Sequence, residues 1–146
     1  MRILLAIALL VLLVVEPASA QASRRLWGTG KEPRVRPGQI LLSGDGSEIL
    51  GGDGWTHGTG LSSFGRVAWT TYNGREAIGT GLLWIDDCDP FCAEGTYHQH
   101  VATVHAFSVS RNVYRRLTIR YSDGGVMRTD RRVLHHFAGW SWDDAR

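Results

Sequence analysis

The alternation of apolar and polar side chains in the segment Val113–Ser122, the clearest in the chain, constrains the fold more than any other feature of the sequence. Successive side chains of a β-strand point to opposite faces of a sheet, so the alternation predicts a strand with one buried and one solvent-facing side. The buried side would carry Val113, Leu117, Ile119 and Tyr121 together with Arg115, and the solvent side would carry Tyr114, Arg116, Thr118, Arg120 and Ser122. The tight turn Asp123–Gly125 then predicts that the more polar segment Val126–Leu134 returns as an edge strand.

A second hairpin is predicted upstream. Two alternating runs, Val67–Tyr72 and Glu76–Ile85, flank the dipeptide Asn73–Gly74. Both residues of this dipeptide tolerate the positive φ that a two-residue hairpin turn requires. The long run Tyr97–Val109 carries apolar residues on both faces, which indicates a strand in the interior of a sheet. Two shorter apolar segments complete the expected strands, Gly38–Ser43 and Glu48–Leu50.

These patterns predict an all-β protein. Beyond the N-terminal apolar run, no window longer than about ten residues shows the period of 3.6 residues that is typical of an amphipathic helix. Strands joined by tight turns predict a single antiparallel β-sandwich or small barrel of about six to seven strands. We expect the β domain to span residues 38–134. A flexible basic leader at 21–37 would precede it, and an aromatic tail at 135–146 would pack on it or be disordered.

The N-terminus predicts export. Arg2 precedes the unbroken apolar run Ile3–Val15, and Ala18–Ala20 has the small-x-small pattern of a signal-peptidase site. The apolar run has 13 residues, whereas a membrane-spanning helix needs about 20. We therefore expect a signal peptide at residues 1–20 and a secreted, extracellular mature chain with no stable membrane span.

The net charge argues against nucleic acid as a partner, whereas the distribution of charge leaves an anionic polymer or a lipid headgroup open. Without residues 1–20 the chain carries 15 basic and 13 acidic side chains, an excess too weak for a dedicated nucleic-acid binder. The segment 45–94 has eight acidic residues against two arginines, and the segment 111–132 has seven arginines against two aspartates. The two segments could pair across one sheet. Alternatively, the arginines could form a basic face for an anionic polymer or a lipid headgroup.

The only two cysteines, Cys88 and Cys92, predict one disulfide, because exported chains fold in an oxidising compartment. The loop that they would close is so short that the chain-entropy contribution is only roughly 2 kcal/mol. The disulfide is thus expected to shape a local turn rather than to hold the domain together.

Three residues are candidates for ligand binding. His98 and His100 would project from the same face of a strand, and Trp55 lies in a glycine-rich segment where an exposed ring could stack on a sugar or anchor a protein. Two strand-borne histidines could also supply two zinc ligands. A third ligand would have to come from His57, His135 or His136. Polar residues at the end of a strand are the more ordinary reading, so we expect no metal and no cofactor.

No catalytic residue is assigned. The sequence lacks a Gly-x-Ser-x-Gly motif, and its Gly-Asp-Gly segments are typical of turns rather than of calcium loops.

Three short motifs in order, Leu61–Gly65, Gly79–Gly81 and Asp87–Gly95, resemble small exported proteins of actinobacteria, of unknown function, that carry a Cys-x-Pro-x-Cys-Ala-x-Gly loop. Phe64 and Asp86 stand where those proteins have tryptophan and asparagine. The resemblance implies export, a disulfide and a β fold, and it implies no activity.

The sequence favours a secreted, monomeric, non-enzymatic binding module whose partner is an unidentified ligand or envelope component. Two alternatives stay open. One is a metal-dependent secreted hydrolase that uses His98 and His100. The other is a secreted protease inhibitor with the cystine loop as its bait.

Overall fold

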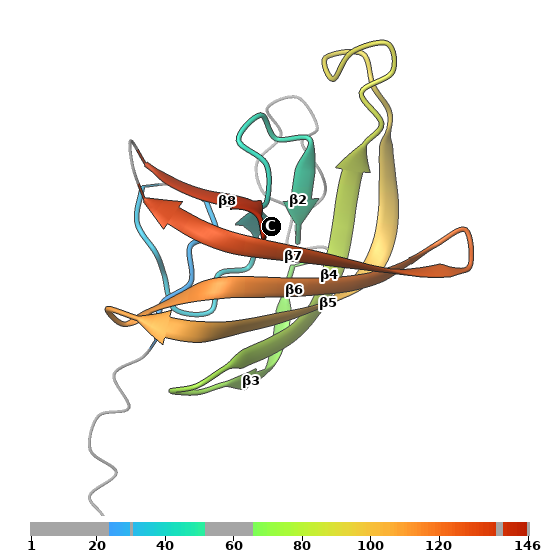
Figure 1. Cartoon of the computed structure of the whole chain (residues 1–146). Coiled ribbons are helices and arrows are strands. Elements are labelled where there is room, and N and C mark those ends of the chain that lie inside the picture. Colours follow the sequence, from blue (N-terminus) through green and yellow to red (C-terminus); the bar gives the residue numbers. More distant parts are fainter. Residues whose placement is uncertain (1–23, 30, 52–65, 137–138, 146) are drawn as a thin grey trace, which may run out of the picture.

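The computed structural model describes residues 24–29, 31–51, 66–136 and 139–145, which form one antiparallel sheet and contain no helix (Figure 1). The order of the strands in the sheet is β1-β2-β4-β5-β6-β7-β8, with β3 paired to β4 outside this path. The all-β, antiparallel fold expected from the sequence is confirmed. The strands are β1 (Ile40–Leu41), β2 (Glu48–Leu50), β3 (Ala68–Tyr72), β4 (Ala77–Asp86), β5 (Tyr97–Ser110), β6 (Val113–Asp123), β7 (Val126–His136) and β8 (Trp140–Asp144).

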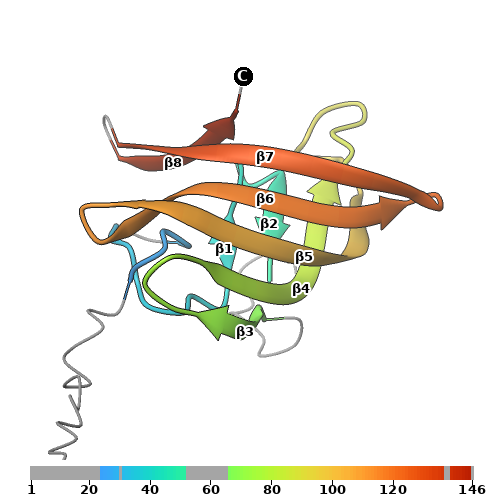
Figure 2. The ribbon, with the colours of Figure 1, turned by 60° about the horizontal axis from the view of Figure 1, so that its bottom comes forward.

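The sheet curls until its two ends approach each other, and the result is a nearly closed barrel (Figure 2). Strand β4 is shared along one edge, because its first half pairs with β3 and its second half pairs with β2. Gly79 permits this arrangement. A Cβ atom at that position would lie 2.8 Å from Val67 and 2.9 Å from Trp69.

The core lies on the inner face of the curled sheet. On β5 every second residue is buried, namely Ala102, Val104 and Ala106, and on β6 Leu117 and Ile119 continue the same layer. The alternation seen in the sequence thus selects the buried side of β6 correctly for Leu117 and Ile119. Tyr114, expected on the solvent side, is instead fully buried.

The N-terminal segment belongs to the fold, so the expectation of a flexible leader at 21–37 is wrong for the residues that the structure describes. Leu26 is fully buried and Trp27 is nearly so. The carbonyl of Gly28 accepts a hydrogen bond from Leu41 of β1, and the carbonyl of Trp27 accepts one from the indole Nε1 of Trp142 of β8. The segment therefore fills the seam between the two ends of the sheet. The basic composition of the segment led to the wrong expectation, because only two of its side chains need to be apolar for the segment to fill this seam.

The C-terminal tail packs on the domain, which was one of the two expected outcomes. Strand β8 pairs with β7, and Trp142 is buried opposite Leu134. Strand β7 was expected at the edge of the sheet, but β8 occupies that edge.

Three expectations fall on residues outside the described part of the chain, namely the signal peptide at 1–20 and the side chains of Trp55 and His57. Among the described residues, none forms a helix long and apolar enough to cross a membrane.

Candidate functional site

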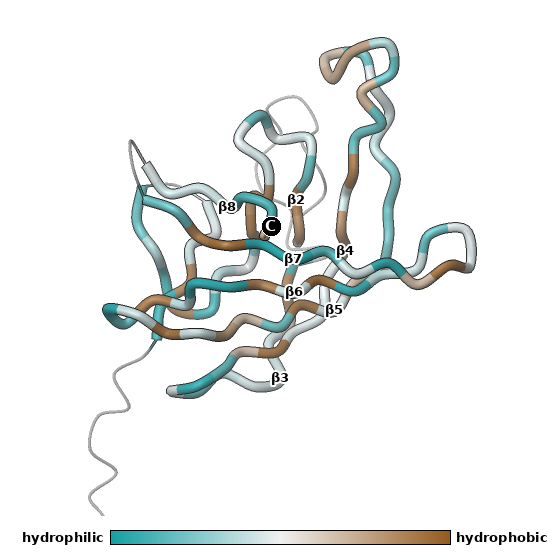
Figure 3. The backbone as a smooth tube through the Cα atoms, viewed as in Figure 1, coloured by the Kyte–Doolittle hydropathy of each residue, from teal (hydrophilic) through white to brown (hydrophobic). Residues whose placement is uncertain are grey.

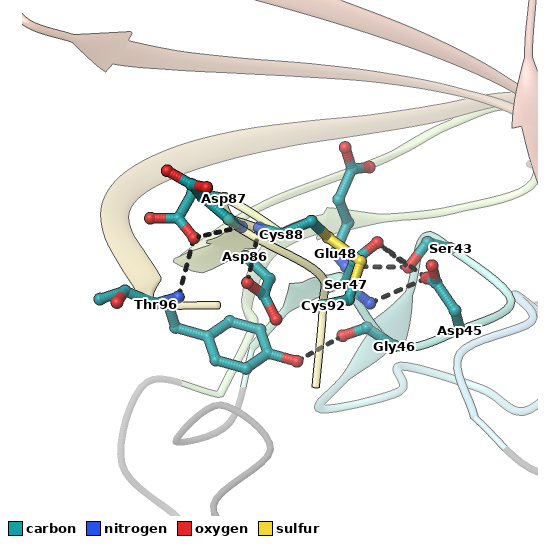
Figure 4. The surroundings of a disulfide bond; sticks show 12 residues. Ser43, Asp45, Gly46, Ser47, Glu48, Asp86, Asp87, Cys88, Cys92 and Thr96 are labelled. Carbon is teal, nitrogen blue, oxygen red and sulfur yellow. Dashed lines mark hydrogen bonds between the residues drawn. A yellow bond between two sulfur atoms is a disulfide. The ribbon is translucent and has the colours of Figure 1, made fainter. Parts of the chain in front are cut away.

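The loop between β4 and β5 is braced by a disulfide between Cys88 and Cys92, as the sequence predicted (Figure 4). The buried carboxylate of Asp86 accepts a hydrogen bond from the backbone N–H of Cys88 at 2.9 Å. Oδ1 of Asp87 accepts one from the backbone N–H of Thr96 at 2.9 Å. Backbone N–H groups such as that of Thr96 lower the pKa of Asp87, because they stabilise its charged form. The acids beside the cysteines therefore shape the turn.

His98 and His100 point to the inner side of the sheet, but each has a separate partner. Nε2 of His98 is hydrogen-bonded to Oδ2 of Asp87 at 3.2 Å. Nδ1 of His100 is hydrogen-bonded to the carbonyl of Ser122 at 3.0 Å, and its ring lies 5.1 Å from that of Tyr121.

His135 and His136 lie at the far end of β7, and within the described ranges no three His, Cys, Asp or Glu side chains are grouped to hold a metal. A ligand-binding role for His98 and His100 stays a prediction, and the described residues give the hydrolase alternative no third ligand.

A pocket of about 570 Å³ lies at the opposite end of β5 from the cystine loop. It is bordered by the N-terminal segment, the turn between β5 and β6, and the start of β8. These three segments lie together at the left of Figure 1. The volume falls within the range of about 300–1,000 Å³ that is usual for small-molecule sites. The side chains that matter for its chemistry are Arg25, Glu32, Arg111, Arg115, His136 and Trp140.

The turn between β5 and β6 brings two parts of the chain together at this pocket. Arg111 and Asn112 have φ angles of 49° and 67°, as a tight hairpin turn requires. The carbonyl of Asn112 accepts a hydrogen bond from the backbone N–H of Arg25 at 2.9 Å, and its side-chain oxygen accepts one from Arg24 at 2.8 Å. These bonds hold Arg25 beside the hairpin that carries Arg111.

Arg115, the third arginine of the pocket, is positioned by the aromatic ring of Trp140. The guanidinium carbon of Arg115 lies 5.6 Å from the ring centroid of Trp140, within the range of a cation–π interaction. The ring of His136 packs against the same indole, with 4.2 Å between the centroids. Because His136 and Trp140 are register partners on β7 and β8, the sheet itself fixes this wall of the pocket.

The pocket is electropositive. It contains three arginines against the single acid Glu32, and none of the three forms an ion pair with an acidic side chain in the part of the chain that the structure describes. Guanidinium groups bind carboxylate and phosphate through two parallel hydrogen bonds, so the arrangement suits an anion.

Of these residues, only His136 was singled out by sequence reasoning, as a possible third zinc ligand. The sequence shows the high density of arginines at 111–132, but it does not show that Arg25 lies beside them in the fold.

A search against family models, curated proteins and solved structures finds no match to this chain. The resemblance to exported actinobacterial proteins thus stays a prediction.

Proposed function

We propose that the protein is an exported, non-enzymatic binding module that holds a small anionic ligand in the pocket at the turn between β5 and β6. The observation that carries the proposal is the convergence of Arg25, Arg111 and Arg115 on one pocket without ion-pair partners among the described acids.

The chemistry of the pocket defines the class of ligand. Three guanidinium groups favour a carboxylate or phosphate group, and the volume accommodates an organic molecule of the size of an acidic sugar. The Trp140 ring holds Arg115 in place before the ligand arrives, which reduces the entropy lost on binding.

Calorimetric titration with glucuronate, inorganic phosphate and glucose tests the proposal. We expect the two anions to bind, the neutral sugar not to bind, and the affinity for the anions to fall as salt is added. The double substitution Arg111→Gln plus Arg115→Gln should weaken binding of the anions by at least about tenfold, because each lost charge-assisted hydrogen bond is worth about 1.5–3 kcal/mol.

The matched control removes the same charge elsewhere. Arg34→Gln plus Arg75→Gln changes two exposed arginines outside the pocket and should leave the affinity within about twofold of the wild type. Equal loss of affinity in both double variants, or equal binding of glucose and glucuronate, would reject the pocket as an anion site.

The cystine loop supports a second candidate function, inhibition of a secreted protease. Phe91 is 53% exposed on this loop, and the disulfide together with the hydrogen bonds to Asp86 and Asp87 braces the backbone around it. A rigid loop that presents an aromatic side chain suits the hydrophobic specificity slot of a chymotrypsin-like protease. Incubation with such a protease distinguishes the outcomes. Sustained inhibition supports the function, whereas rapid cleavage after Phe91 without inhibition dismisses it.

A further inference from the structure

The arginines of β6 and β7 are divided between the two faces of the sheet. On the inner face Arg132 binds Glu48, Asp130 and Asp144. On the outer face Arg116, Arg120 and Arg131 are exposed, and none of them forms an ion pair with an acid in the described ranges. An ion pair with the acidic segment at 45–94 thus accounts for Arg132, through Glu48, and leaves the outer arginines without an acidic partner among the described residues.

None of the cross-strand neighbours of these arginines on β5, β6 and β7 is acidic. Arg120 lies between Thr103 on β5 and Thr129 on β7. Arg131 lies beside Thr118, whose other neighbour is His105.

Two acids lie at the margin of this face, and both have histidine partners. Glu76 is hydrogen-bonded to His105 at 2.9 Å, and Asp143 lies 3.9 Å from His135. The centre of the face is therefore positively charged.

Apolar side chains continue the same face beyond Arg120. Val101 is two residues from Thr103 on β5, and Met127 pairs with Ser122 at the end of β6. Their exposed fractions are 70% and 60%. Figure 3 shows the start of β7 in brown, beside the turn between β6 and β7. A soluble anion would need only the unpaired arginines, so it does not account for the exposed aliphatic side chains beside them.

We propose that the outer face of β5, β6 and β7 docks on an anionic lipid surface. Arg116, Arg120 and Arg131 bind the lipid phosphates, while Val101 and Met127 enter the boundary between headgroups and acyl chains. Basic residues draw a protein to an anionic bilayer, and apolar residues then contribute by leaving water. A soluble polyanion would use the arginines alone. The proposal is independent of the pocket, because none of these five residues lines it.

Co-sedimentation with vesicles tests the proposal. We expect the full mature chain to bind vesicles made of equal parts of phosphatidylglycerol and phosphatidylcholine, and not vesicles of phosphatidylcholine alone. Arg116→Gln plus Arg120→Gln plus Arg131→Gln should weaken partitioning by about a hundredfold, because each arginine near an anionic surface contributes about 1 kcal/mol. The charge-matched control, Arg34→Gln plus Arg66→Gln plus Arg75→Gln, should lose less than about threefold.

The double variant Val101→Ser plus Met127→Ser separates lipid from soluble polyanion. It should weaken binding to the anionic vesicles by about thirtyfold and leave binding to dextran sulfate unchanged, since burial of each of the two aliphatic side chains is worth about 1 kcal/mol. Absence of vesicle binding would overturn the proposal. So would equal effects of the two arginine triple variants, or vesicle binding that does not change in the double variant. All substituted side chains are exposed, so each variant should keep the circular dichroism of the wild type.

Discussion

Arg132 of β7 binds Glu48 of β2 across the interior of the curled sheet, although the two residues are 84 positions apart in the sequence. The same guanidinium group also binds Asp130 at 2.7 Å and Asp144 at 3.2 Å. Its side chain is only 12% exposed, so one cation holds three carboxylates together where the ends of the sheet meet. The ion pair thus joins β2 to β7, which are not neighbours in the sheet.

Replacement of Arg132 should destabilise the fold. Arg132→Ala leaves Glu48 and Asp130 half-buried without their cation, and breaking a fully buried pair costs about 3–5 kcal/mol. We expect about 2 kcal/mol here, because both carboxylates keep some contact with water. Urea denaturation measures the change. Arg128→Ala is the control, since its pair with Asp123 is exposed and should be worth less than about 1 kcal/mol. Equal losses in the two variants would contradict a special role for Arg132.

Ionisation of Glu48 should lower the stability of the fold as the pH rises, which is opposite to the effect of a typical paired carboxylate. Burial raises the pKa of Glu48 and outweighs the attraction of Arg132, which lowers it. The protonated form is therefore favoured by folding. The stability that protonated Glu48 contributes is fully present below the unfolded pKa of about 4.3, and it is lost as the pH rises through the folded pKa.

The variant Glu48→Gln, which cannot ionise, isolates this effect. The free energy of unfolding of the wild type minus that of the variant should fall as the pH rises from about 4 to 7. Urea titrations at several pH values measure the difference, and a difference that grows with pH would mean that the attraction of Arg132 dominates instead.

The tyrosines should ionise at a higher pH in the folded protein than in the unfolded chain. Burial raises the pKa of Tyr72 to about 12, and it also raises the pKa of Tyr97, Tyr114 and Tyr121. These are the four tyrosines of the chain. Because folding favours the neutral phenols, their contribution to stability is complete below about pH 10 and is lost as the pH rises through the folded values. Tyrosinate absorbance should therefore appear at higher pH in the native protein than in guanidinium chloride. A native tyrosine that titrates together with the denatured chain would contradict this.

The N-terminal segment should be needed for stability. Leu26→Ala removes a fully buried side chain and should cost about 2–4 kcal/mol, measured by thermal or urea unfolding. Lys31→Ala, in the same segment but exposed, should cost less than about 0.5 kcal/mol. If the two variants unfold at the same urea concentration, the segment is a leader after all.

Much of the β architecture could be predicted because its signals are local. Alternation along β6 and the Asn73–Gly74 dipeptide before β4 depend on neighbouring residues only, and they placed these strands correctly. The expected two-residue turn is wrong, because the connection is the four-residue loop 73–76 and neither Asn73 nor Gly74 has a positive φ. The disulfide followed from there being only two cysteines, Cys88 and Cys92, to pair.

Functional candidates were harder to predict, since a pocket is made by residues from several parts of the chain. His98 and His100 attracted attention because they are close in sequence, yet the structure gives them separate partners. The arginine pocket had no motif of its own to reveal it.

The sequence by itself determined most of the strands and the side of β6 that buries Leu117 and Ile119, because the period of two residues is a property of each strand. It did not show that Trp140–Asp144 forms a strand, β8. Only the tertiary structure decided that Leu26 closes the barrel, that Arg132 meets Glu48, and that Arg25 joins Arg115 at one pocket. Each of these contacts depends on how far the whole sheet twists and curls, and that angle accumulates over many strands. No single segment of the sequence encodes it.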